Sequence, residues 1–333
     1  MRFIDSSVEI IEQESGLLGV YKQIERAARL SYKSEDRITE DSAKKMVDTL
    51  VKNGHLACLE HGTIYLRIPL NDDENGMYFD RYYFNPYSIL IDEDHDGFDD
   101  ALCITTNTRV LVENGWLDDL QYICEPTEYH AKRISVKFTT SIGITRELLR
   151  HRTFSFMNES TRYCNYSKGK FGSELTFVIP EWIYNVQAEI ASYPDPLTHD
   201  SREWLMNKHG EDLIKYLCCF NRSVFSWRNC LNRIEEDYNY LTTTDEGYQL
   251  KAQEARGILP MDTKSEIIMT GFVDDWLHFF ALRSYIAATG KPHPDIQKLA
   301  DVLLQEFLNR GYITNEDVKN LEDEKRKQTD KDD

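Results

Sequence analysis

The feature that most constrains this chain is a strand pattern that leads directly into a run of arginines. Residues 134–142 alternate apolar and polar side chains, which predicts a half-buried β-strand, and Gly143 ends the pattern. A short helix is predicted at 145–151. It leads into five side chains that can carry positive charge: Arg146, Arg150, His151, Arg152 and Arg162. The sequence therefore predicts an α/β fold in which a helix that follows a strand carries a cationic cluster.

The charge of this cluster is opposite to that of the whole chain. The formal net charge is −18, from 57 acidic and 39 basic residues. A guanidinium group gives a phosphate or carboxylate two parallel hydrogen bonds, so the cluster predicts a small anionic ligand. The acidic excess argues against a general nucleic-acid coat protein, whose affinity would come from neutralising phosphates. A solvated helix end with ordinary surface arginines is the alternative interpretation.

The composition predicts a globular protein from a reducing compartment. With 333 residues and 41% hydrophobic content, the chain can bury a substantial core. Its seven cysteines form no C-x-x-C pair, so neither a disulfide framework nor a zinc ribbon is predicted. The N-terminus has no apolar signal core, and no run of about 18 apolar residues occurs. We therefore expect a soluble, cytoplasmic protein with no membrane partner.

Hydrophobic periodicity predicts a few strands among longer helices. Helices are predicted at 19–30, 39–53, 106–113, 201–240, 249–256 and 264–288, and further strands at 8–11, 64–68 and 175–179. The expected fold class is α/β, with a central mixed or antiparallel sheet packed by long helices in a single domain over 1–314. Charged residues dominate 315–333, which predicts a disordered tail.

An acidic loop resembles half of a calcium site. Asp92, Asp94, Asp96 and Gly97 match the first half of an EF-hand loop. The twelfth loop position, which should supply a bidentate Glu, is Cys103, and no clear helix precedes the loop. A solvated acidic loop is the better interpretation, and no metal site is predicted.

The spacing within the arginine run is specific. Arg150-His151-Arg152 is followed by seven residues, Ser160, and then Arg162-Tyr163. This pattern resembles the signature of the flavin-dependent thymidylate synthases. Further elements resemble that family in order along the chain: Glu60-His61 with Thr63, Ala255-Arg256-Gly257-Ile258-Leu259-Pro260, Phe280-Ala281-Leu282-Arg283, and His293. The resemblance covers most of residues 50–310. Glycine fingerprints for nucleotides are missing, and Gly169-Lys170-Phe171-Gly172 does not qualify as one.

The resemblance implies a reaction and its cofactors. The family converts deoxyuridine monophosphate (dUMP) to dTMP by reductive methylation, with methylene-tetrahydrofolate as one-carbon donor. Reduced flavin adenine dinucleotide (FAD) supplies the hydride, NADPH regenerates the flavin, and the enzyme provides no nucleophile. The resemblance also implies a homotetramer with active sites between subunits. Residues 71–131 are interpreted as an insertion relative to short members.

The resemblance further implies residue roles. The residues implied for FAD are His61, Thr63, Arg150, His151, Arg152, Asn158, His278 and His293, with His61 and Thr63 reaching from a neighbouring subunit. Those implied for dUMP are Glu147, Arg150, Asn158, Glu159, Ser160, Arg162, Arg256 and Arg283. Arg283 is the implied catalytic residue, because a cation at the uracil edge would favour the N3-deprotonated ring and make carbon 5 more nucleophilic.

The chain departs from the family pattern at two places. The position two residues before the signature Ser, commonly Glu, is Asn158, and Glu159 lies one position later. Asparagines of the late helix that meet the adenine end align with Phe272, Asp274 and His278. Ser160 is interpreted as a substrate-orienting hydroxyl; the competing interpretation, an activated nucleophile, would need a paired base.

Two other classes of function compete with this one. The first is a non-catalytic nucleotide or single-stranded RNA-binding protein that uses the Arg150–Arg162 cluster, with Tyr163 and Tyr166 as stacking platforms. The net charge argues against it, as does the spacing of the later arginines. The second is a metal-dependent hydrolase based on His55 and His61, which lacks any paired-ligand spacing.

Overall fold

The computed structural model describes residues 1–73, 75–93, 101–168, 174–190, 198–243, 248–287 and 290–332. The chain divides into two compact units, and the predicted single domain over 1–314 stays a prediction. The smaller unit comprises residues 1–6, 140–144 and 161–264, and the larger unit comprises residues 7–139, 145–160 and 265–333. The chain passes between the units several times, so no single linker marks a boundary in the sequence.

A four-stranded sheet lies at the centre of the larger unit. Its strands, in spatial order, are β2 (Ser7–Ile11), β6 (Arg133–Ser141), β9 (Lys264–Phe272) and β7 (Ser155–Asn158). The pairs β2–β6 and β7–β9 are antiparallel, with Val8 opposite Phe138 and Phe156 opposite Met269. The predicted strands at 8–11 and 134–142 are confirmed, and so is the mixed α/β fold class with an antiparallel sheet.

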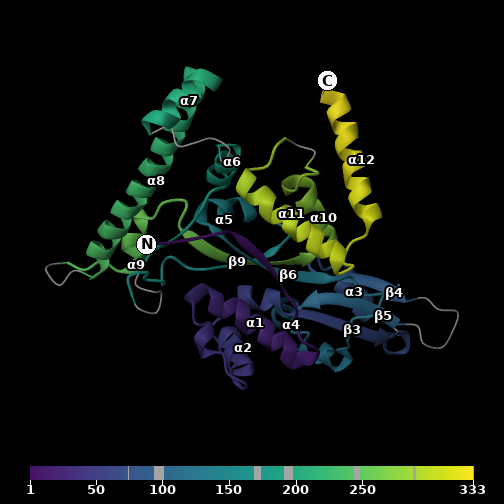
Figure 1. Ribbon diagram of the computed structural model, residues 1–333. Helices are drawn as coiled ribbons and strands as arrows, with labels where there is room; N and C mark the ends of the chain where they lie inside the picture. The colour runs from purple at the N-terminus through teal and green to yellow at the C-terminus, as the bar shows by residue number, and fades with distance from the viewer. Residues whose placement is uncertain are drawn as a thin grey trace. The chain divides into compact units, whose positions relative to one another are not determined.

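Helices cover both faces of this sheet (Figure 1). Those concerned are α1 (Gly16–Tyr32), α10 (Val273–Arg283) and α11 (Pro294–Asn309). On one face, Ala27 and Leu30 of α1 pack against Ile268 of β9. On the other face, the Phe138 ring of β6 lies 6.3 Å from the Trp276 ring of α10, centroid to centroid. The sheet is therefore buried on both sides.

This double burial explains one wrong prediction. The sequence predicted one helix over 264–288, but residues 264–272 form β9 and the helix α10 begins only at Val273. A strand that is covered on both faces is apolar on both, so its pattern cannot be distinguished from that of a buried helix. The Asp275 carboxylate accepts a hydrogen bond from the Phe272 backbone N–H at 2.9 Å, which marks the start of α10.

A second sheet in the larger unit comes largely from the segment 71–131. Its strands, in spatial order, are β3 (Thr63–Pro69), β5 (Ala101–Asn107) and β4 (Ile89–Glu93), and both neighbouring pairs are antiparallel. The predicted helix at 106–113 is α4 (Thr108–Asn114), whose first turn is capped by the Asn107 side chain accepting from the Val110 N–H. Beside the sheet lie α2 (Ser42–Lys52), α3 (Met77–Tyr83) and the 3-10 helices η1 (Glu35–Arg37), η2 (Leu56–His61), η3 (Leu70–Asp73) and η4 (Leu117–Tyr122).

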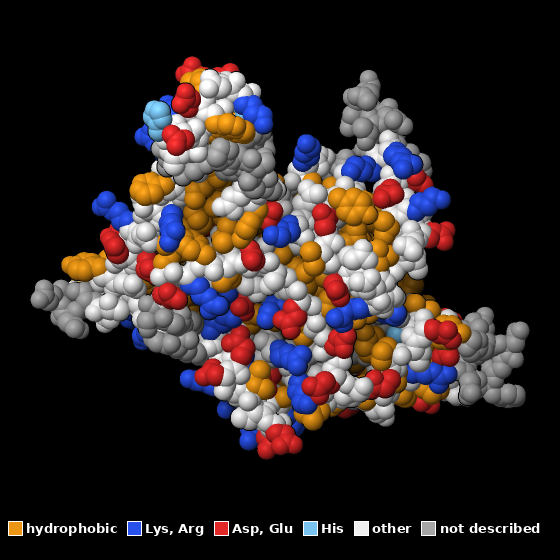
Figure 2. All heavy atoms as spheres, viewed as in Figure 1, with side chains coloured by type: hydrophobic (Ala, Val, Ile, Leu, Met, Phe, Trp, Pro, Cys, Tyr) orange, Lys and Arg blue, Asp and Glu red, His pale blue; other side chains and the backbone are white. Residues whose placement is uncertain are grey.

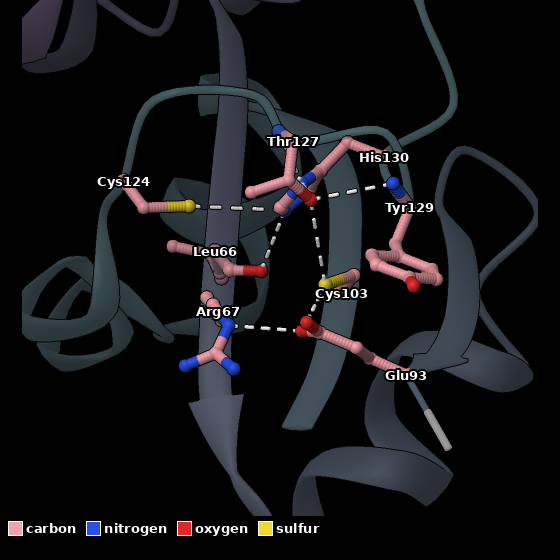
Figure 3. Close-up of polar contacts among 8 residues, drawn as sticks. All are labelled: Leu66, Arg67, Glu93, Cys103, Cys124, Thr127, Tyr129 and His130. Carbon is pink, nitrogen blue, oxygen red and sulfur yellow. Dashed lines mark hydrogen bonds and ion pairs between the residues drawn. The ribbon is translucent and has the colours of Figure 1, made fainter. Parts of the chain in front are cut away.

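A polar cluster ties these strands together (Figure 3). Arg67 donates from Nε to Glu93 at 2.9 Å, and the Cys103 thiol donates to the same carboxylate at 3.4 Å. His130 Nε2 lies 3.0 Å from the backbone oxygen of Leu66. Burial raises the pKa of Cys103 to about 11 and lowers that of His130, so both are neutral at pH 7. The cluster therefore acts as a structural tie.

Most of the acidic loop that resembles half of a calcium site is not described by the structure. Residues 94–100 lie outside the described residues, as do 169–173. Asp92 lies in β4, and Cys103, the expected twelfth position, is buried in β5. In the part of the chain that the structure describes, no group of three or more side chains that could ligate a metal occurs.

The smaller unit is mainly helical. It contains α6 (Glu181–Ile190), α7 (His199–His209), α8 (Glu211–Thr243), α9 (Ala252–Ala255), the 3-10 helix η6 (Arg256–Ile258), and the parallel pair of β1 (Arg2–Ile4) with β8 (Thr176–Val178). The predicted helix at 201–240 is thus two helices, separated at Gly210, whose φ of 81° favours glycine. The hydrophobic core of the smaller unit includes Cys164, Phe177 and Leu231.

The predicted disordered tail is helical: α12 spans Asn315–Asp332. Thr314 Oγ1 accepts from the Asp317 N–H at 3.2 Å, while the Asp317 carboxylate accepts from the Thr314 N–H at 2.7 Å, so the helix has a reciprocal cap. Val318 is buried, and Lys325 donates to the backbone oxygen of Tyr285 at 2.8 Å. These contacts stabilise a segment whose composition alone favours disorder. Among the described residues, no helix is both long and apolar enough to cross a membrane.

Candidate active site

The arginine run and the end of α10 together line a pocket in the larger unit. Helix α5 (Ile142–Leu148) ends just before the signature, and the Arg150 N–H then donates to the Glu147 backbone oxygen at 3.2 Å to form a turn. The pocket has a volume of about 440 Å³ and is here called the arginine pocket. It is lined by Arg150, His151, Arg152, Thr153, His278, Leu282, Arg283, Lys291 and Pro292. None of these described lining residues carries a carboxylate.

Arg283 is held by two side chains from the segment that carries the signature. Its Nη1 lies 3.2 Å from the Glu147 carboxylate, and its Nε donates to His151 Nε2 at 3.1 Å. His151 is buried, and its ring centroid lies 5.0 Å from that of Phe279. The structure therefore brings together Glu147, His151 and Arg283, which the sequence assigned to one site from places far apart in the chain.

His151 is neutral at pH 7. Burial lowers its pKa to about 4, and the neighbouring side chains of Arg283, His278 and Arg150 act in the same direction. Because Arg283 Nε donates to Nε2, the imidazole carries its proton on Nδ1. The ring is thus an acceptor that fixes the direction of the guanidinium group.

Three predicted residues follow each other at the end of β7. The Glu159 N–H donates to the Glu266 backbone oxygen at 2.8 Å, and the Ser160 N–H donates to that of Ser31 at 3.0 Å. The Glu159 side chain is buried. Asn158 Oδ1 is buried without a hydrogen-bond partner among the described residues. It is an acceptor available to a ligand.

Arg162 and Arg256 lie in the smaller unit, and both are exposed. Arg162 donates to Gln253 at 3.2 Å and lies over the Tyr163 ring, with its guanidinium carbon 5.3 Å from the centroid. Arg256 donates to Thr161 Oγ1 at 3.4 Å. The segments of the two arginines therefore meet within this unit.

Four predicted flavin residues do not line the arginine pocket: Asn158, described above, and His61, Thr63 and His293. His61 is fully buried, with Nδ1 2.8 Å from Thr270 Oγ1, and burial together with Arg133 lowers its pKa to about 3. The buried Thr63 donates its backbone N–H to Gln13 at 2.9 Å. His293 caps α11 by accepting from the Asp295 N–H at 3.3 Å. The roles assigned to these residues stay predictions.

Two residues of the larger unit were missed by sequence reasoning. Lys291 lines the arginine pocket. Residues 288–289, shortly before it in the chain, are not described by the structure. Lys33, at the end of α1, forms an ion pair with Glu266, beside the signature strand β7. Burial lowers the pKa of Lys33, and Glu266 and Glu159 raise it by more, so it stays charged. A lone lysine after an apolar helix gave no signal of this position.

The structure contradicts one part of the RNA-binding alternative. Tyr166 is buried in the core of the smaller unit, with its ring centroid 6.3 Å from that of Tyr238, so it cannot stack on a base. Tyr163 is exposed. On the face seen in Figure 2, acidic and basic side chains are interspersed, with no continuous basic band. Backbone-tracking binding would need such a band.

A protein-family model described as "Thymidylate synthase complementing protein" matches residues 127–310, more than half of the chain. The chain belongs to this family, the flavin-dependent thymidylate synthases. A "Probable flavin-dependent thymidylate synthase" of Paramecium bursaria Chlorella virus 1 is 23% identical over 175 residues, which cover 52% of this chain and 67% of that protein. The flavin-dependent thymidylate synthase of Mycolicibacterium gilvum is 28% identical over 144 residues, 43% of this chain and 46% of that protein. The match thus spans about half the length of the bacterial relative.

Two solved structures are also similar over most of the chain. A UMP/dUMP methylase, PolB from Streptomyces cacaoi, bound with 5-Br dUMP, has a TM-score of 0.39 and 17% identity, covering 93% of each chain. Thymidylate Synthase X from Helicobacter pylori, with FAD and dUMP, has a TM-score of 0.33 and 13% identity, covering 94% of this chain and 99% of that chain. Because these scores are low, the family assignment rests on the sequence match.

Proposed function

We propose that the protein is an enzyme that converts dUMP to dTMP by flavin-dependent reductive methylation, with methylene-tetrahydrofolate as one-carbon donor and NADPH as reductant. The observation that carries this proposal is the arginine pocket, in which Arg283 is held between Glu147 and a neutral His151. These residues belong to the stretch that matches the family, and their chemistry suits a substrate that becomes more negative as it reacts.

The residues of the pocket fit the phosphate groups of FAD. Arg150, Arg152 and Lys291 line it, and none of its described lining residues carries a carboxylate, so it offers charge-assisted donors to a pyrophosphate. Asn158 Oδ1 lacks a partner among the described residues and suits an N–H of a ligand ring. When bound, FAD supplies the hydride chemistry that no side chain can perform.

The protein's own contribution is charge and position. The guanidinium of Arg283 stabilises the negative charge that develops on the uracil ring, which makes carbon 5 more nucleophilic. Glu147 and His151 orient that guanidinium, and His151 does so without adding a second charge. Arg150, Glu159 and Ser160, together with Arg162 and Arg256, stay the predicted ligands of dUMP.

No enzyme nucleophile is needed in this proposal. Burial raises the pKa of Cys58 to about 11 and that of Cys103 to about 11, so neither supplies a thiolate at pH 7. Ser160 is interpreted as an orienting hydroxyl. The prediction of a homotetramer with active sites between subunits can be tested by sedimentation velocity, which reports the size of the assembly.

The cellular compartment of the protein and the bounds of its domain are also proposals. The seven cysteines are all free, which favours a reducing compartment such as the cytoplasm. The family match covers residues 127–310, and a single domain over 1–314 with 71–131 as an insertion relative to short members stays a proposal.

The test begins with the visible absorbance of the purified protein. An oxidised-flavin spectrum that NADPH bleaches without oxygen, faster when dUMP is present, supports the proposal. Formation of dTMP from dUMP and methylene-tetrahydrofolate then establishes the reaction. A protein that cannot be reconstituted with FAD but binds single-stranded RNA with a steep salt dependence would favour the non-catalytic alternative.

A further inference from the structure

A second cavity adjoins the arginine pocket within the larger unit. It has a volume of about 250 Å³ and is here called the side pocket. Its lining residues are Glu60, Tyr87, Asn107, Arg109, Val110, Glu113, Arg152, Thr153, Phe154 and Ser155. Arg152 and Thr153 line both pockets, so the two compartments share a wall. Half of the lining comes from the segment 71–131, most of which lies outside the stretch that matches the family.

The charges of the side pocket balance. The guanidinium of Arg109 donates to the Glu113 carboxylate at 2.8 Å and also to the Glu60 carboxylate. These hydrogen bonds raise the pKa of Arg109. With Arg152, the lining holds two cations and two anions. The side pocket therefore suits a neutral polar group, whereas the arginine pocket suits an anion.

The side pocket offers both donors and acceptors. Arg109 Nε is buried and has no hydrogen-bond partner among the described residues. An unpaired buried donor is unfavourable unless a ligand supplies an acceptor. The carboxylates of Glu60 and Glu113 each have two oxygens and keep acceptor capacity after binding Arg109. A ligand here should present a donor and an acceptor together.

An exposed aromatic ring belongs to the lining. Tyr87 is 65% exposed, in the loop between α3 and β4. The Asn85 side chain accepts from the Tyr87 backbone N–H at 2.9 Å and from Ser88 Oγ at 3.2 Å. Ser88 Oγ lies 2.8 Å from Thr106 Oγ1 on β5. Because this loop is tied to the sheet, its backbone is already ordered when the exposed ring stacks on a flat ligand.

We propose that the side pocket binds the adenine of a dinucleotide whose phosphates lie in the arginine pocket. Adenine has a flat π face for Tyr87, an amino group for the carboxylates of Glu60 or Glu113, and ring nitrogens that accept from Arg109 Nε. The cavity is smaller than a typical site for a whole ligand, which suits one base. The inference rests on the proposed function, which requires FAD and NADPH, both of which carry adenine.

The test compares binding of paired ligands to matched variants. Tyr87→Ala should raise the Kd for the adenine-bearing dinucleotide about tenfold, and leave that for the ligand half without adenine unchanged. The pairs are FAD with FMN, and NADPH with reduced nicotinamide mononucleotide, measured by calorimetry. Tyr87→Phe keeps the ring and should bind like wild type. Phe84→Ala removes an exposed ring of the same segment outside the side pocket, and should also bind like wild type.

The outcomes distinguish FAD from NADPH as the source of the adenine. They also distinguish failure of this inference from failure of the proposed function. A selective loss for FAD assigns its adenine to the side pocket, and a selective loss for NADPH assigns that of the reductant. The inference is overturned if Tyr87→Ala weakens neither dinucleotide, or weakens FAD and FMN equally without a selective loss for NADPH. It is also overturned if wild type binds neither dinucleotide. The proposed function fails separately, when wild type binds FAD but forms no dTMP.

Discussion

Replacing Arg283 with alanine should abolish turnover while the protein stays folded. The side chain makes two polar contacts, with Glu147 at 3.2 Å and with His151 at 3.1 Å, and it is 18% exposed against 31% for Glu147. A partly exposed pair of this kind contributes about 1 kcal/mol to stability. For a chain of this size, that corresponds to a fall in Tm of roughly 2–4 °C.

The effect on the reaction should be much larger than the effect on stability. Removing one preorganised group that stabilises developing charge lowers kcat by about 100- to 1000-fold. The pKa of His151, about 4 with Arg283 present, should rise but stay below that of a free imidazole, because burial is its main cause and persists. The assays are dTMP formation, thermal unfolding, and NMR titration of the imidazole.

A matched control is available in the same segment. Arg146 is exposed and does not line the arginine pocket, so Arg146→Ala should retain activity. FAD binding should survive in Arg283→Ala, since Arg150, Arg152 and Lys291 remain. The role given to Arg283 is refuted if this variant keeps more than about a tenth of wild-type kcat, or if its activity returns when excess FAD is added.

Three further predictions concern stability. Native His151 and His61 resist protonation, with pKa values of about 4 and about 3, while the unfolded chain takes up these protons near pH 6.5. Stability should therefore fall as pH drops from 6.5 to 4.5, by an amount on the order of 4 kcal/mol from these two rings, measured by urea unfolding. Lys33→Met breaks a largely buried ion pair and should cost about 2 kcal/mol, seen as a lower urea midpoint. Gly271→Ala places a Cβ 2.6 Å from the Phe154 ring and should cost about 1–3 kcal/mol, seen as a lower Tm.

Each of these three predictions has a control. For the first, His151→Asn should remove about half of the loss of stability between pH 6.5 and 4.5, and an unchanged slope would contradict the pKa argument. Lys137→Met, which breaks a more exposed pair, should cost less than about 1 kcal/mol, and equal effects of the two lysine variants would contradict the importance of burial. Gly143→Ala, where the nearest atom would lie at 3.5 Å, should be tolerated better than Gly271→Ala.

Local pattern was sufficient for much of the fold. The alternation at 134–142 predicted β6, and the helical periodicity at 39–53 predicted α2. Helix α2 buries one face and exposes the other, and β6 alternates apolar and polar side chains, so each leaves its own period in the sequence. The spacing from Arg150-His151-Arg152 to Ser160 likewise indicated the family without any knowledge of tertiary contacts. It did so because binding side chains on one short segment keep a fixed separation.

The elements that were missed depend on distant neighbours. Residues 264–272 form a strand because β6 and β7 lie on either side of β9, and residues 101–107 form one because β3 and β4 flank β5. Both strands are largely buried, so neither shows an alternation of apolar and polar side chains. The tail at 315–332 is helical because Thr314 and Asp317 cap its first turn and Val318 is buried.

For the site, as for the fold, the sequence determined some features and the tertiary structure decided the others. The sequence by itself determined which side chains carry charge, where the cationic cluster begins, and to which family the chain belongs. Only the tertiary structure decided that Arg283 meets Glu147 and His151, and that Tyr87 and Arg109 line a compartment next to Arg152. Residue type and spacing are properties of the chain, whereas a contact between residues more than a hundred positions apart depends on how sheets and helices pack.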